Sequence, residues 1–115
     1  MEGKEIRQKL LETFGKQVMF NKDFDSYVTR LKGGMLNELI EWCRRCKENK
    51  ELGSVPQKKE FKHLYVFFRK IASDVRVTLI KEQNKDFTEI RLEGHKDYDD
   101  TRLKLGYKKS SYYGS

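Results

Sequence analysis

The sequence predicts an α+β fold: a four-stranded, mainly antiparallel sheet with a helical hairpin packed on one face, and an extra helix at the N-terminus. Three observations lead to this prediction. Residues 63–93 hold three consecutive segments with strand periodicity, an earlier apolar run offers a fourth strand, and the first 50 residues hold three helical patterns. A chain of 115 residues is expected to form a single domain.

The helices are predicted from apolar positions that recur with helical spacing. Residues 2–14 place apolar side chains on one face, and Gly15 is a typical C-terminal stop. Residues 18–20 form a short apolar run that predicts a strand. Residues 24–31 carry an i, i+3, i+4, i+7 stripe, and residues 35–50 form a longer amphipathic helix with a basic end.

Three strands are predicted in the second half of the chain. Residues 63–71 are almost continuously apolar and aromatic, while residues 75–81 and 87–93 alternate with a period of two. Turn-type residues at 72–74 and 83–86 separate these segments, so an antiparallel meander is expected.

The charge composition favours an anionic partner. Twenty-five Lys and Arg face 18 Asp and Glu, which gives a net charge of +7 and an isoelectric point of about 9.4. Nucleic acid, an acidic protein or an anionic membrane would fit this charge. Because no signal peptide and no long apolar run is present, we expect a cytoplasmic protein without a membrane partner. Cys43 and Cys46 form a C-x-x-C motif without further ligands, which favours two ordinary helix thiols over zinc.

We divide the domain into a helical extension over residues 1–16, a core over 17–100 and a basic, tyrosine-rich tail over 101–115. The tail carries cations and aromatic rings without any acidic residue. Aromatic rings stack on splayed bases and cations meet phosphate, so this composition suits RNA, although a solvated tail is the alternative. The tail residues assigned to RNA binding are Arg102, Lys104, Tyr107, Lys108 and Lys109.

Short motifs within residues 17–99 resemble a known family. LYVFFR at 64–69 followed by DVRV at 74–77 resembles the paired-arginine hairpin of the RelE/ParE toxin superfamily. GHKDY at 94–98 resembles that family's closing signature, and residues 20–31 resemble its first strand running into its first helix. The chain departs from the family in its N-terminal helix and in the short spacing from its histidine to its tyrosine in the closing signature.

The resemblance implies a toxin of a toxin–antitoxin system. RelE-like members cleave mRNA in the ribosomal A site, whereas ParE-like members act on DNA gyrase, and the fold alone does not separate them. We therefore expect an endoribonuclease that acts on mRNA at the ribosome, without metal or other cofactor, and that a cognate antitoxin inhibits. The antitoxin is expected beside the sheet and the helix with Trp42. The alternatives are a toxin directed at gyrase or another protein, and a non-catalytic nucleic-acid-binding module.

The residues expected to carry this chemistry follow the same motifs. His95 is the natural acid or base because imidazole titrates near neutrality, with a surface histidine as the alternative. Arg76 is expected to point away from the core and clamp the scissile phosphate. Tyr98 is expected to stack a base or donate a proton, unless it is a tyrosine at the edge of the core. Lys96 completes the catalytic set; Arg69 and Arg91 join the RNA-binding set, although Arg91 could be paired with Glu89.

Overall fold

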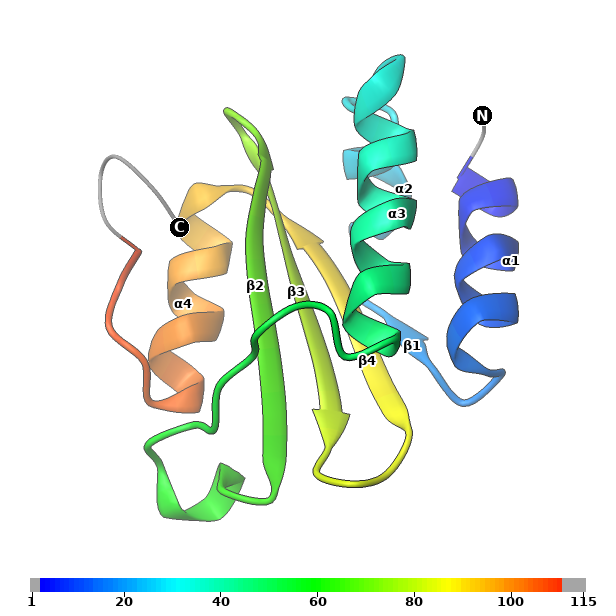
Figure 1. Cartoon of the computed structure of the whole chain (residues 1–115). Coiled ribbons are helices and arrows are strands. Elements are labelled where there is room, and N and C mark those ends of the chain that lie inside the picture. The colour runs from blue at the N-terminus through cyan, green and yellow to red at the C-terminus, as the bar shows by residue number, and fades with distance from the viewer. Residues whose placement is uncertain (1–2, 111–115) are drawn as a thin grey trace.

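The computed structural model describes residues 3–110. Four helices, one 3₁₀ turn and four strands follow one another along this part of the chain (Figure 1). In chain order they are α1 (Gly3–Phe14), β1 (Met19–Phe20), α2 (Phe24–Val28), α3 (Gly34–Lys47), η1 (Lys59–Phe61), β2 (Leu64–Ala72), β3 (Val75–Glu82), β4 (Phe87–Glu93) and α4 (His95–Leu105).

The four strands form one mixed sheet in the order β1-β4-β3-β2. Strands β2, β3 and β4 pair as the antiparallel meander that the sequence predicts, and β1 pairs parallel to β4. The backbone of Ser54, in the linker after α3, pairs with Val66 on the outer edge of β2. The α+β prediction with a four-stranded, mainly antiparallel sheet is therefore confirmed.

One face of the sheet carries the larger core, which the first three helices cover (Figure 1). Side chains from β2, β3 and β4, among them Phe67, Leu79 and Ile90, meet the apolar sides of α2 and α3. Helix α1 packs on α2 and α3 and buries Ile6 and Leu10 completely. The N-terminal helix is therefore part of the core, because its apolar stripe faces the neighbouring helices.

Replacing Leu10 by alanine is expected to lower the free energy of unfolding by about 2–5 kcal/mol, because it removes a fully buried side chain and leaves a cavity between helices. Denaturant unfolding of the full chain measures the change. Gln8→Ala, at an exposed position of the same helix, is the control and should change stability by less than about 0.5 kcal/mol. A similar small change for Leu10→Ala would show that α1 is not integral to the core.

The predicted helical hairpin, α2 and α3, lies on one face of the sheet, and helix α4, which was not predicted, covers the other face (Figure 1). It spans 11 residues and includes residues 101–105, which were predicted to belong to a tail. Its residue Leu105 packs with Val66 and Ile80 in a smaller core. The helix was missed because it is strongly polar and buries only Tyr98, Asp99 and Leu105, so its apolar period is weak.

Candidate functional site

Helix α4 separates the four predicted catalytic residues into two groups. His95 and Lys96 begin the helix and are exposed, whereas Tyr98 points to the sheet and is buried. Arg76 lies on β3 and is also buried. The exposed group and the buried group therefore do not form a single site.

The exposed group centres on His95. Its Nε2 atom lies 3.1 Å from Oδ2 of Asp99, one helical turn further along α4. The His95 side chain is 47% exposed, whereas that of Asp99 is only 11% exposed. The other oxygen of Asp99, Oδ1, accepts hydrogen bonds from the backbone N–H of Ser110 at 2.9 Å and from its hydroxyl at 2.7 Å.

The chain after α4 brings Ser110 to this position. Gly106 ends the helix with a φ of +96°, which favours glycine, and the chain reverses direction. The backbone N–H of Tyr107 then donates to the carbonyl of Arg102, and Arg102 Nε donates to the carbonyl of Lys108. Residues 106–110 therefore run back along α4, so that Ser110 reaches Asp99 and Lys109 lines the same depression as His95.

These residues line one shallow depression at the start of α4. It is bordered by His95, Lys96, Asp99, Asp100, Lys109 and Ser110. Lys96 forms an ion pair with Asp100 at 3.3 Å, and both side chains are exposed. Although burial acts to raise it, hydrogen bonds from Ser110 and the charges of His95 and Lys109 hold the pKa of Asp99 below its usual value. The depression thus combines an exposed imidazole, a buried carboxylate and two lysines.

Asp99 and Ser110 are not among the residues predicted from the sequence. The i, i+4 spacing of His95 and Asp99 is a usable signal, but it has meaning only once a helix is recognised there. Ser110 is eleven residues from its partner, and only the reversal of the chain after Gly106 brings the two together. The remaining tail residues, 111–115, lie outside the described part of the chain.

The buried group lies between α4 and the sheet. Arg76 is only 4% exposed; its Nη1 donates to the carbonyl of Ser73 at 2.9 Å. Tyr98 is fully buried with its ring edge-on to Phe68, and burial raises the pKa of its hydroxyl. Both side chains are therefore enclosed between α4 and the sheet, and Arg76 is not exposed as expected. The predicted roles of Arg76 as a phosphate clamp and of Tyr98 as a base-stacking residue stay predictions.

The interface beneath α4 contains polar atoms that are not satisfied. Within residues 3–110, four buried side-chain atoms on this face lack a hydrogen-bond partner. They are Arg76 Nε, Thr78 Oγ1, Arg91 Nε and Tyr98 OH. A buried donor without a partner costs about 1–3 kcal/mol, so this interface contributes less stability than its area suggests.

Two predicted RNA-binding arginines are held by carboxylates. Arg91 bonds to Glu89 at 2.6 Å and to Glu93 at 3.1 Å, as the alternative interpretation of its neighbours anticipated. Arg69 of β2 bonds to Glu38 of α3 at 2.8 Å. A guanidinium that already bonds to carboxylates has fewer free donors for a phosphate, and the RNA-binding role of both residues stays a prediction.

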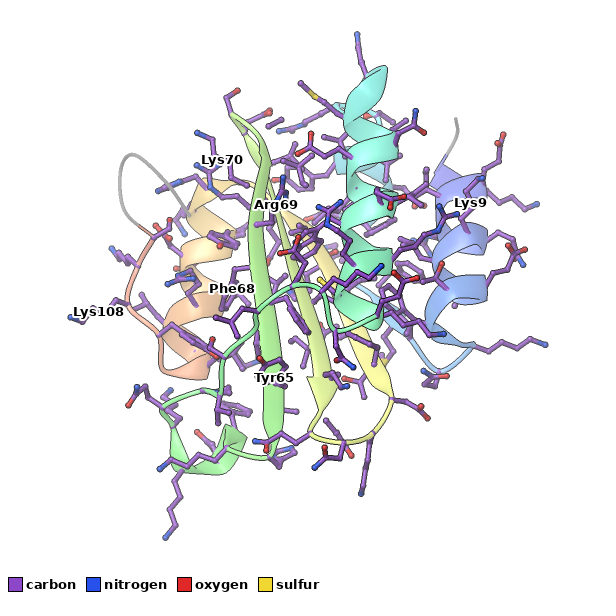
Figure 2. The ribbon with its side chains drawn as sticks, viewed as in Figure 1. Lys9, Tyr65, Phe68, Arg69, Lys70 and Lys108 are labelled. Atoms are coloured by element: carbon purple, nitrogen blue, oxygen red, sulfur yellow. The ribbon has the colours of Figure 1, made fainter. Side chains whose placement is uncertain are left out.

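The side chains of Arg102 and Tyr107 contact other parts of the protein, whereas the side chains of the neighbouring lysines are exposed. The guanidinium of Arg102 lies 4.5 Å from the ring centre of Phe68 and 5.5 Å from that of Tyr107. The Tyr107 hydroxyl bonds to Ser54. These contacts fasten α4 to β2 and the linker. Lys108 extends into solvent (Figure 2), and Lys104 and Lys109 are also exposed.

The two cysteines of α3 are buried free thiols. Burial raises the pKa of Cys46 to about 12 and that of Cys43 well above its usual value, so both remain protonated and unreactive. Residues 3–110 contain no cluster of three or more His, Cys, Asp or Glu side chains arranged to hold a metal ion.

No helix in the described part of the chain has the length and apolar character needed to cross a membrane. Comparison of the chain with protein-family models, with curated proteins and with solved structures finds no match.

Proposed function

We propose that the protein is a cytoplasmic endoribonuclease toxin of the RelE/ParE type, which cleaves mRNA on the ribosome and is inhibited by a cognate antitoxin. The observation that carries the proposal is the depression at the start of α4, which the exposed His95 and its partner Asp99 line together with Lys96 and Lys109. The four-stranded sheet has the architecture that the family resemblance implies.

The depression contains groups that RNA cleavage requires. His95 takes the proton of the ribose 2′-hydroxyl, and the 2′-oxygen then attacks the phosphorus. The bond to the 5′-oxygen breaks, and that oxygen takes a proton from water. Lys96 and Lys109 face the phosphate and balance the charge that develops on it, next to the positive end of the α4 dipole.

Basic side chains around the end of α4 support an RNA partner. The segment before β2 lies against this end, since Phe61 packs in the same small core as Leu105. Lysines of both segments are exposed and form no ion pair within residues 3–110. They are Lys58, Lys59, Lys62, Lys104 and Lys108.

The direct test is primer extension on an mRNA that is translated in vitro with the purified protein. We expect cuts within codons that appear only when ribosomes are present. Cuts in free RNA would support the proposed nuclease activity but would show that it does not depend on the ribosome. If RNA is bound in low salt but not cut, the nuclease proposal is wrong.

The second candidate is a non-catalytic nucleic-acid-binding module. The burial of Arg76 and Tyr98 favours it, because two residues of the predicted catalytic set are out of reach of a substrate in this conformation. A binding module would use the same basic surface as the nuclease. Only the absence of cuts in the primer-extension test therefore distinguishes the two candidates.

Removing two lysines of the depression should reduce the salt dependence of RNA binding. Each phosphate contact to a single strand contributes about 0.7 to the slope of log K against log salt. We therefore expect Lys96→Ala with Lys109→Ala to lower that slope by about 1.4, measured by fluorescence anisotropy. The matched control is Lys4→Ala with Lys9→Ala on the exposed side of α1, far from Lys108 (Figure 2). Equal slopes for the two double variants would show that RNA does not bind at the depression.

A further inference from the structure

The two carboxylate oxygens of Asp99 have different partners. Oδ2 faces His95 Nε2 at 3.1 Å, while Oδ1 accepts both hydrogen bonds from Ser110. Asp99 is 8% exposed, so this is one of the few nearly buried acidic groups in residues 3–110. The carboxylate is thus held on one side and directed at the imidazole on the other.

This arrangement determines which ring nitrogen of His95 carries the proton. An ionised carboxylate only accepts hydrogen bonds, so Nε2 has to be the donor to Oδ2. In neutral imidazole the other nitrogen, Nδ1, is then without a proton and is free to accept one. Because nearly half of the His95 side chain is exposed at the depression, solvent or a substrate can approach it.

We propose that Asp99, held by Ser110, is the positioning residue of His95: it fixes the ring and its Nε2–H tautomer, so that Nδ1 exchanges the proton with the substrate. The tautomer follows from the contacts alone, and only its catalytic consequence rests on the proposed function. When Nδ1 takes the proton of the 2′-hydroxyl, the resulting imidazolium lies against the Asp99 carboxylate, which stabilises its charge.

The competing explanation is that Asp99 only anchors the returning segment 106–110 to α4. In that case the imidazole would sample both tautomers, and its contact with Asp99 would have no chemical consequence. The two explanations differ in the state of the ring nitrogens, which can be measured without RNA.

The experiment is long-range ¹H–¹⁵N NMR of the full chain with labelled histidine, at a pH of about 8.5 where imidazole is ordinarily neutral. The chain has two histidines, so a His63→Gln variant assigns the signals of His95. We expect wild-type His95 to be predominantly the Nε2–H tautomer. A predominant Nδ1–H tautomer or an even mixture in the wild type overturns the proposal, whatever the variants do.

Asp99→Asn gives the sharpest contrast. The two donors of Ser110 should hold the amide oxygen, which turns the amide NH₂ toward Nε2 and forces the Nδ1–H tautomer. The matched control is Asp97→Asn, which is exposed in the first turn of the same helix and should leave the tautomer unchanged. A folded Asp99→Asn protein that keeps the Nε2–H tautomer contradicts the proposal.

Cleavage provides the second readout. Asp99→Asn should lose at least about 10-fold in cleavage rate, as part of the roughly 10²–10⁴-fold that a positioned acid or base supplies, whereas Asp97→Asn should retain wild-type activity. If the tautomers behave as expected but the wild type cuts no RNA, the positioning holds and the proposed function fails. If the wild type cuts RNA but the tautomer is not fixed, the function stands and this inference fails.

Discussion

Replacing His95 by alanine is expected to reduce the single-turnover rate of mRNA cleavage by about 10²- to 10⁴-fold, the contribution of a positioned general acid or base. The expectation rests on the exposure of its imidazole, its contact with Asp99 at 3.1 Å and the two lysines beside it. The rate is measured by quenching a translation reaction at intervals and quantifying the cut product by primer extension.

His63→Ala is the control for this prediction. His63 is exposed just before β2 and belongs to neither group of predicted catalytic residues. Its removal should leave the rate unchanged. Equal losses of rate in both variants would indicate a general effect on folding. An unchanged rate in His95→Ala would show that another residue is the general acid or base.

The second large effect is expected in stability, at Tyr98. Tyr98→Ala should lower the free energy of unfolding by about 3–5 kcal/mol, because it empties a fully buried site between α4 and the sheet. Tyr98→Phe removes only a buried hydroxyl that has no hydrogen-bond partner within residues 3–110. It should therefore leave stability within about 1 kcal/mol of the wild type or raise it.

Denaturant unfolding measures both changes, and the same Tyr98→Phe protein should be tested for cleavage. If Tyr98 is structural, as its burial indicates, cleavage persists in Tyr98→Phe. Loss of cleavage with stability retained would instead show that the hydroxyl reaches the substrate. That outcome would require α4 to leave the sheet during the reaction, since the ring is covered in this conformation.

The buried and the exposed groups of predicted residues show what the local sequence pattern can predict about a site and what it cannot. The alternation of residues 75–81 correctly separated Val77 and Leu79 from Arg76 and Thr78 on the two faces of β3. It did not show that the face with Arg76 is covered, because burial of that face depends on α4, which lies about twenty residues further along the chain. The alternation of a strand shows which side chains share a face of the sheet, but it does not show whether that face is exposed to solvent.

The amino-acid sequence by itself determined the fold class, the meander from β2 to β4 and the charge of the surface, because strand alternation, helical stripes and net charge are local properties of a chain. Only the tertiary structure decided which candidate residues are accessible. It buried Arg76 and Tyr98, paired Arg91 with two glutamates, and joined His95 to Asp99 and Ser110. The reason is that these contacts join separate segments, and α4 is held by a few aromatic and polar contacts without a strong apolar period.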